Sequence, residues 1–259
     1  MSADTAPLQG VGVLVTRPAA QAGALCERIE QYGGTALRFP VLEITPPADP
    51  QGLIRFSAKL DTFDWAFFVS ANAVQMALSV ILEQRDWPAS VRIAVIGKRS
   101  AEALLRFGLV ADLVPENRFD SEGLLALPQL QQVAGKHCVI FRGGSGRSLL
   151  ADTLRERAAR VEYVEAYRRS RPVADSGPVV TGLGAGQIDI VLVNSVESLE
   201  NLFTMLDDAG RALLRQTPLL VVSERMLPVA ERLGFVLPPI LAANATNDAV
   251  LDALIEWRR

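Results

Sequence analysis

The stretch Val11-Gly12-Val13-Leu14-Val15-Thr16-Arg17-Pro18 decides the fold class, because it joins a short apolar run to a small polar turn and then to a helix. Leu25 and Ile29 follow at helical spacing, and Pro18 suits the first helical position, where its missing N–H costs nothing. The same order of strand, turn and helix recurs in runs that begin at Trp65, Val91, His137, Ile188 and Leu219. Strands written as continuous Val/Ile/Leu runs are typical of parallel sheets covered by helices on both faces. We therefore predict an α/β fold built on parallel sheets.

Two proline-rich segments divide this repeating pattern. The first is Pro46-Pro47-Ala48-Asp49-Pro50, and the second runs from Arg171 to Pro178. About 120 residues lie between them, which is the size of a complete domain. The roughly 40 residues before and 85 residues after are each small for such a domain, and together they would complete one. Composition therefore permits, without requiring, a discontinuous domain with a second domain inserted into it.

The composition of the 259 residues excludes several classes of protein. Hydrophobic residues make up 49% and charged residues 21%, so the chain can bury a core and is not expected to be disordered. The net charge of −3 disfavours a nucleic-acid-binding surface. No apolar run approaches the ~18 residues of a membrane span, and Met1–Gly10 has no secretory signal. We expect a cytoplasmic protein without a nucleic-acid or membrane partner.

Two cysteines and one histidine limit the chemistry of any site. A metal site is not expected, because a zinc ion usually takes three or four such ligands, and Cys26 and Cys138 cannot build a disulfide framework. His137 lies in an apolar run and is expected to begin a strand, whereas Cys26 falls at a core position of a helix. Gly143-Gly144-Ser145-Gly146 matches no nucleotide fingerprint, which disfavours a nucleotide cofactor.

The turns after the six expected strands are rich in groups that bind anions. In a parallel sheet these turns lie at the carboxyl edge, where ligands bind, and each opens a helix whose free N–H groups attract negative charge. The turns supply hydroxyls, amides and cations, namely Thr16, Arg17, Ser70, Asn72, Lys98, Ser100, Arg142, Asn194, Ser195, Ser223 and Arg225. Cations are least stabilising at this end of a helix, which favours an anionic ligand. For any single Ser, Thr or Asn, a helix cap that needs no ligand is the preferred interpretation.

Tyr163 and Tyr167 lie in the run Val161–Arg169, which is expected to be a strand. The two-residue period of a strand would place both side chains on one face. Tyr167 is the last apolar residue before the second proline-rich break. Its hydroxyl could reach a ligand at a domain junction, but a ring that simply covers the core is the preferred interpretation of the residues alone.

Taken in order, these segments resemble the uroporphyrinogen-III synthase family of tetrapyrrole biosynthesis over nearly the whole chain. The resemblance rests on Val-Leu-Val-Thr16-Arg17-Pro18, Phe39-Pro40-Val-Leu-Glu-Ile44, Phe68-Val-Ser70-Ala-Asn72-Ala-Val74, Ile96-Gly97-Lys98-x-Ser100-Ala, Phe141-Arg142-Gly143 with Gly146-Arg147 and Leu150, Glu165-Ala-Tyr167-Arg168-Arg169, Asn194-Ser195, and Leu233-Gly234-Phe235. The turn Ser223-Glu224-Arg225-Met226 departs from it, since the family often has a Gly-Pro-Thr-like turn there. Val69-Ser70 and Asn194-Ser195 stand where the family often has Thr-Ser.

The resemblance implies two flavodoxin-like α/β domains joined by a two-stranded β linker, with the second domain inserted into the first. It places the discontinuous first domain at residues 1–38 and 172–259, the inserted domain at 45–163, and the linker strands at 39–44 and 164–171. It also places Tyr167 beside a cleft between the domains.

The activity that the resemblance implies is that of a lyase in haem biosynthesis. Such an enzyme closes hydroxymethylbilane, a linear tetrapyrrole with many carboxylates, with loss of water and inversion of ring D. The resemblance implies no metal and no organic cofactor, and we expect a monomer whose partner is this small-molecule substrate. Tyr167 would be catalytic, and the substrate would be bound by Thr16, Arg17, Ser70, Asn72, Lys98, Ser100, Arg142, Gly143, Ser195, Ser223 and Arg225.

Two other functions fit the same pattern of turns. A two-lobed protein that binds or senses a small anion without catalysis would need the same basic, helix-lined carboxyl edges, but the absence of a signal peptide weakens this alternative. A two-lobed transferase for a phosphorylated or nucleotide substrate is weakened by the absence of a glycine-rich phosphate loop. Incubation with hydroxymethylbilane and analysis of the product isomers separates both from a synthase.

Overall fold

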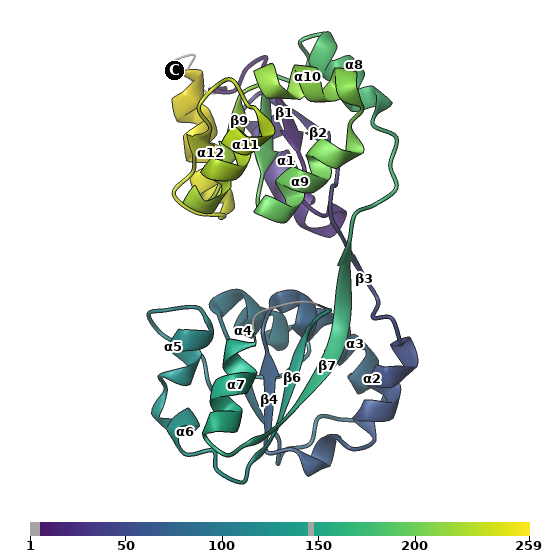
Figure 1. Ribbon diagram of the computed structural model, residues 1–259, viewed down its shortest axis with the longest axis vertical. Helices are drawn as coiled ribbons and strands as arrows, with labels where there is room; N and C mark the ends of the chain where they lie inside the picture. The colour runs from purple at the N-terminus through teal and green to yellow at the C-terminus, as the bar shows by residue number, and fades with distance from the viewer. Residues whose placement is uncertain (1–5, 145–147) are drawn as a thin grey trace. The chain divides into compact units, whose positions relative to one another are not determined.

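The computed structural model describes residues 6–144 and 148–259, and in this part the chain forms two compact units (Figure 1). The first unit combines Met1–Glu43 with Ser170–Arg259, and the second is Ile44–Arg169. Each unit contains one five-stranded sheet. The predicted α/β class with parallel sheets is confirmed, and the boundary between the units falls within strand β3 and at the end of strand β7.

The first unit has a sheet in the order β10-β9-β8-β1-β2, in which all neighbours are parallel. Its strands are β1 (Gly12–Val15), β2 (Thr35–Arg38), β8 (Ile190–Val193), β9 (Leu219–Val221) and β10 (Ile240–Leu241). Its helices are α1 (Ala19–Gln31), α8 (Gly177–Gly184), α9 (Val196–Met205), α10 (Asp208–Gln216), α11 (Leu227–Leu233) and α12 (Asn247–Arg258), with a short 3₁₀ turn at Glu224–Met226. Helices α8 to α11 contribute to the core on one face, and α1 and α12 to the core on the other.

The second unit has a sheet in the order β3-β7-β6-β4-β5, in which β7, β6, β4 and β5 are parallel. Its strands are β3 (Glu43–Thr45), β4 (Trp65–Phe68), β5 (Arg92–Val95), β6 (His137–Gly143) and β7 (Arg160–Ser170). Its helices are α2 (Pro50–Ser57), α3 (Ala71–Gln84), α4 (Lys98–Leu105), α5 (Ser121–Leu125), α6 (Pro128–Gln131) and α7 (Leu149–Glu156), with a 3₁₀ turn at Leu60–Thr62. Helices α2 to α4 pack on one face and α5 to α7 on the other.

The strands are as buried as their composition predicts. All four residues of β1, β4 and β8 are buried, because helices cover both faces of each sheet. Some boundaries differ from the sequence prediction. Pro18 is the residue before α1 instead of its first position, and β6 continues two residues past Phe141 to Gly143.

The segments expected to form linker strands are partly built into the two units. Phe39 and Val41 are buried in the core of the first unit and lie outside any strand. Strand β7, which contains the second expected linker segment up to Ser170, belongs to the sheet of the second unit, and the short β3 is its neighbour.

The strand orders locate one switch point in each sheet. Numbered within its own unit, the first sheet runs 2-1-3-4-5, which is the flavodoxin-like order. The crossovers change direction between β1 and β8 in the first unit, and between β4 and β6 in the second. Ligands of open parallel sheets bind beyond the carboxyl ends of the strands at such points.

Candidate active site

The switch point of the second unit opens into a cavity of about 380 Å³. The cavity is lined by residues that follow β4 and β5, by residues of β6 and β7, and by two helix residues. They are Val69, Ser70, Ile96, Ser121, Ile140, Arg142, Gly143, Leu150, Tyr163, Tyr167 and Arg169. Four of the predicted site residues meet there: Ser70, Arg142, Gly143 and Tyr167. The position of the cavity agrees with the rule for open parallel sheets.

Strand β7 contains a bulge between Glu165 and Tyr167. Arg142 pairs with Glu165, but the next residue of β6, Gly143, pairs with Tyr167, so β7 advances by two residues while β6 advances by one. One extra residue in a strand moves every later side chain to the opposite face. The prediction that Tyr163 and Tyr167 share a face is therefore wrong.

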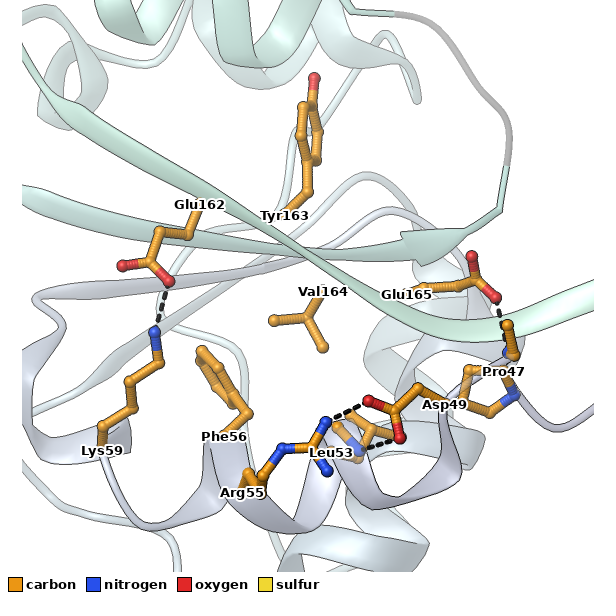
Figure 2. A pocket seen from close by; sticks show the side chains of 12 residues that line it. Pro47, Asp49, Leu53, Arg55, Phe56, Lys59, Glu162, Tyr163, Val164 and Glu165 are labelled. Carbon is orange, nitrogen blue, oxygen red and sulfur yellow. Dashed lines mark hydrogen bonds and ion pairs between the residues drawn. The ribbon is translucent and has the colours of Figure 1, made fainter.

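The surroundings of the two tyrosines show this change of face. Tyr167 packs into the core cluster formed with α2 and α3, whereas Tyr163 is 39% exposed and its ring lies near Arg142 and Arg155. Figure 2 shows Tyr163 pointing away from α2, on the face of β7 opposite to Val164. Bulges beside functional sites commonly redirect a side chain in this way.

Tyr167 is itself 3% exposed, so its ring covers the core and also forms part of the cavity wall. Its hydroxyl oxygen lies 3.2 Å from Ser70 Oγ. Gly143 makes room for the ring, because a Cβ built on Gly143 would lie 3.0 Å from Tyr167 Cε2 and Cζ. These contacts bring residues 70, 143 and 167 to one point.

Ser70 combines two roles that the sequence analysis treated as alternatives. It is the N-cap of α3, since its Oγ accepts a hydrogen bond from the Ala73 N–H at 3.1 Å. The same oxygen contacts Tyr167 and lines the cavity. The cap interpretation is thus confirmed for Ser70, and the cap oxygen still faces the cavity.

Two arginines give the cavity its positive charge. Arg142 is half-buried, donates from Nε to the Gly143 carbonyl at 3.1 Å, and places its guanidinium 4.7 Å from the centre of the Tyr163 ring. Arg169 is exposed and lines the same cavity. Ser121, the first residue of α5, adds a third polar group. A guanidinium pair beside a hydroxyl suits a carboxylate ligand.

Arg169, Ser121 and Tyr163 were not among the residues predicted for the site. Arg169 follows Tyr167 by two residues in the same run, and Ser121 begins a helix after Asp120, so both positions were visible in the sequence. What the sequence did not reveal is that both segments border the end of β6.

The other predicted residues of the second unit lie at helix starts outside the lining of this cavity. Lys98 begins α4, is exposed and lies 5.4 Å from the ring centre of Phe119. Ser100 is buried in the first turn of that helix, and Asn72 is half-buried in the first turn of α3. Gly146 and Arg147, which contribute to the family resemblance, lie outside the described residues.

The switch point of the first unit is held together by Thr16 and Arg17. The Thr16 hydroxyl is buried and donates to the Leu192 carbonyl at 2.7 Å. Arg17 is 8% exposed and donates from Nε to Asn194 Oδ1, from one terminal nitrogen to Asn247 Oδ1, and from the other to the Ala245 carbonyl. The Arg17 side chain therefore cross-links the turns after β1 and β8 with the start of α12.

The remaining predicted residues of the first unit are also at helix starts. Ser195 caps α9 by accepting from the Ser198 N–H at 3.0 Å. Ser223 precedes the 3₁₀ turn at Glu224–Met226 without a side-chain cap, and Arg225 in that turn is exposed. Each therefore remains a candidate for binding an anion at this edge.

A second hollow in the second unit, of about 420 Å³, lies between α2 and residues 162–165 of β7 (Figure 2). Its carboxylates are already paired inside the protein. The Lys59 ammonium holds the pKa of Glu162 below its usual range, and the Arg168 guanidinium, with the Ala48 N–H, does the same for Glu165. This hollow contains none of the predicted site residues.

His137 and Cys138 lie at the opposite end of β6 from the cavity. His137 begins the strand, as predicted, and its ring stacks on Phe63 with centres 4.0 Å apart. Burial, with a smaller effect from Asp64, raises the pKa of the Cys138 thiol to about 12, so this cysteine is inert as a nucleophile. In residues 6–144 and 148–259 no group of three or more His, Cys, Asp or Glu side chains could hold a metal ion. Within the same residues, no helix has the length and apolarity needed to cross a membrane.

Comparison with known proteins agrees with this geometry. A family model described as uroporphyrinogen-III synthase HemD matches residues 23–252. The uroporphyrinogen-III synthase of Escherichia coli K12 is 37% identical over 246 residues, which cover 94% of this chain and 100% of that protein. The chain belongs to the uroporphyrinogen-III synthase family. It is accordingly an enzyme, a cyclising hydro-lyase of tetrapyrrole biosynthesis.

Other members of the uroporphyrinogen-III synthase family extend this result. The enzyme of Salmonella typhimurium LT2 is 35% identical over the same share of both chains. The crystal structure of a mutant uroporphyrinogen III synthase from the extremely thermophilic bacterium Thermus thermophilus superposes with a TM-score of 0.62 at 21% identity, covering 96% of this chain and all of that one. At this identity the structural similarity establishes the fold, and the family assignment rests on the sequence matches.

Proposed function

We propose that the chain closes hydroxymethylbilane to uroporphyrinogen III, with loss of water and inversion of ring D. The observation that carries this proposal is the 37% identity with the Escherichia coli uroporphyrinogen-III synthase along the whole of that protein. The cavity at the switch point of the second unit supports it, because it joins two arginines to a serine and a tyrosine hydroxyl. This combination suits a ligand that carries carboxylates and a leaving hydroxyl.

The arginines of the cavity would bind carboxylates of the substrate. Arg142 and Arg169 both line the cavity, and a planar guanidinium matches the geometry of a carboxylate. The positive ends of the helix dipoles of α3 and α4, where Asn72 and Lys98 lie, would add to the attraction. At the first unit, Ser195, Ser223 and Arg225 offer further contacts, and Thr16 and Arg17 would hold the turns in position.

The acid step would use Tyr167. When the hydroxyl group leaves the ring A end of the bilane, its oxygen must gain a proton, and a phenol is protonated at neutral pH. The Tyr167 hydroxyl is fixed beside Ser70 on the cavity wall. The carbon left behind is an azafulvene cation, which ring D attacks.

Inversion of ring D would be a matter of positioning. Without an enzyme the free carbon of ring D attacks, and the product is the uninverted isomer. An enzyme that holds the two ends of the chain so that the substituted carbon attacks instead forms a spiro intermediate, which opens and recloses with ring D reversed. Restricting the reacting ends in this way supplies rate without a dedicated nucleophile.

Isomer analysis tests the proposal directly. The protein is incubated with freshly prepared hydroxymethylbilane, and the products are oxidised and separated by chromatography. We expect isomer III at a rate above the spontaneous closure, and a Tyr167→Phe variant that folds normally but turns over ~10²-fold more slowly. Isomer I alone, at the spontaneous rate with the intact protein, would refute the reaction and favour a non-catalytic anion-binding protein.

We also propose that the enzyme works as a monomer in the cytoplasm. Cys26 and Cys138 are both buried free thiols, which supports a reducing compartment. Light scattering of the purified protein would measure the mass in solution, and a mass near twice 28.0 kDa would contradict the monomer.

A further inference from the structure

The contact between Ser70 and Tyr167 has a direction that the surrounding hydrogen bonds help to define. Ser70 Oγ accepts the Ala73 N–H at 3.1 Å and lies 3.2 Å from the Tyr167 oxygen. A serine oxygen has two acceptor positions and one proton. Ser70 therefore either gives its proton to Tyr167, or accepts the proton of Tyr167 and keeps its own for another acceptor.

Acidity and burial both favour the second arrangement. A phenol is a stronger acid than an alkyl alcohol, so Tyr167 is the better donor of the pair. Tyr167 is 3% exposed, whereas Ser70 is half-buried, and both line the cavity. Ser70 is therefore the more exposed residue of the pair. Ser70 also stands at the start of α3, a helix of 14 residues, whose positive end stabilises negative charge on the two oxygens.

We propose that Ser70 relays the proton of Tyr167 to the substrate. This inference rests on the proposed dehydration of hydroxymethylbilane. The Ser70 O–H protonates the leaving oxygen as the C–O bond breaks with its electron pair on oxygen, and Tyr167 gives its own proton to Ser70 at the same time. Water departs, and Tyr167 is left as a phenolate.

The proton returns in the second half of the reaction. When the ring closes, the ring D carbon that forms the last bond loses its proton to restore the aromatic pyrrole. That proton passes through Ser70 back to Tyr167. The protein is unchanged after one turnover, and no further reactant takes part.

The bulge in β7 and the glycine at position 143 both help to place the Tyr167 hydroxyl beside Ser70. The bulge turns Tyr167 to the face on which α3 begins, and Gly143 leaves room for its ring at 3.0 Å. A tyrosine that served only to fill the core would not need its hydroxyl placed beside a cap residue. The relay accounts for why the ring is buried while its oxygen meets Ser70.

The test compares Ser70→Ala, Ser70→Thr and Tyr167→Phe. Because general acid catalysis contributes typically 10²–10⁴-fold, we expect Ser70→Ala and Tyr167→Phe to lower kcat by a similar factor of ~10² or more. We expect the double variant to be no slower than the slower single variant, since both changes interrupt one path. Ser70→Thr keeps the hydroxyl and should retain most of the activity.

Asp207→Ala is the matched control for the loss of a helix cap. Asp207 caps α10 by accepting from the Gly210 N–H at 2.7 Å, and it lines neither cavity of the second unit. Thermal melting is used to check that both cap variants fold. Asp207→Ala should keep the wild-type rate. If Ser70→Ala is also within about threefold of wild type, Ser70 is a cap alone and the relay is refuted.

A proton inventory on the wild-type enzyme provides an independent measurement. In mixtures of H₂O and D₂O, two protons that move together give a curved dependence of kcat on the deuterium fraction, whereas direct transfer from Tyr167 gives a straight line and overturns the relay. Failure of the proposed function looks different, because the intact enzyme would then form no isomer III. If Tyr167→Phe has a low kcat and Ser70→Ala has a kcat near that of the wild type, the relay is refuted, but the proposed reaction is not.

Discussion

Gly143→Ala tests whether the position of the Tyr167 ring matters for the reaction. The added Cβ would lie 3.0 Å from two ring carbons and 3.3 Å from the hydroxyl oxygen of Tyr167. Ordinary van der Waals contact begins at 3.4 Å, so the ring must move by about 0.4 Å, which is 3.4 minus 3.0. The backbone of Gly143 has no positive φ, so the effect comes from the contact alone.

Directed along the line between the two oxygens, a displacement of this size would lengthen the hydrogen bond to Ser70 to about 3.6 Å, which is 3.2 plus 0.4. That bond is 3.2 Å long, and a bond of this type is lost beyond about 3.5 Å. We expect overpacking to lower the free energy of unfolding by ~1–3 kcal/mol. We expect kcat to fall by about 10–100-fold, since a 1 Å misplacement of a reacting group can cost 10²-fold.

Gly144→Ala is the matched control, because its Cβ would lie 3.4 Å from Glu165 Oε2, an ordinary contact with a carboxylate. The rate of isomer III formation is measured for both variants, alone and combined with Tyr167→Phe. Gly143→Ala should slow the enzyme that has Tyr167 and should add no further loss to Tyr167→Phe. A Gly143→Ala enzyme as fast as Gly144→Ala would refute the claim that the ring position sets the rate.

Three further predictions concern stability and cofactors. Burial alone would raise the pKa of Asp64, but hydrogen bonds from Lys136 and the His137 N–H outweigh it and lower the pKa, so the free energy of unfolding should fall as pH drops below about 4. In acid titrations, Asp64→Asn should make this dependence on pH less steep. In urea titrations at pH 7, the same variant should lower the free energy of unfolding by about 1 kcal/mol. An unchanged acid slope in Asp64→Asn would contradict this. Arg17→Met should lower the free energy of unfolding by ~1–3 kcal/mol, since it leaves three acceptors, in the turn after β8 and at the start of α12, without this donor. An unchanged melting temperature would count against the cross-link. Treatment with a chelator should leave the rate of isomer III formation unchanged, and a loss that an added metal reverses would exclude the proposed mechanism.

The sequence predicted the fold because each element of a parallel α/β unit is coded locally. The continuous apolar runs at β1, β4 and β8 identified buried strands, and the polar turns after them identified helix starts. Ser70 and Ser195 were expected as helix caps, and both accept the hydrogen bonds of caps. The carboxyl edges of the sheets were therefore found from short windows of sequence.

The arrangement of the site depends on contacts that no short window contains. The bulge in β7 exists only in its pairing with β6, so the period of two placed Tyr167 on the wrong face. Ser70 and Tyr167 are 97 residues apart in the chain, and Arg17 reaches Asn194 across 177 residues. The sequence shows that Arg169 is close to Tyr167 in the chain, but only the structure shows that Arg169 lines the cavity.

The measurement that tests the central claim most directly follows the new carbon–carbon bond. Hydroxymethylbilane is labelled with ¹³C at its hydroxymethyl carbon and at the substituted α-carbon of ring D, and the product formed by the enzyme is examined by NMR. We predict a direct one-bond coupling between the two labels, because inversion of ring D joins those two carbons. A product in which the labelled carbons show no such coupling has closed without inversion, and it would contradict the account.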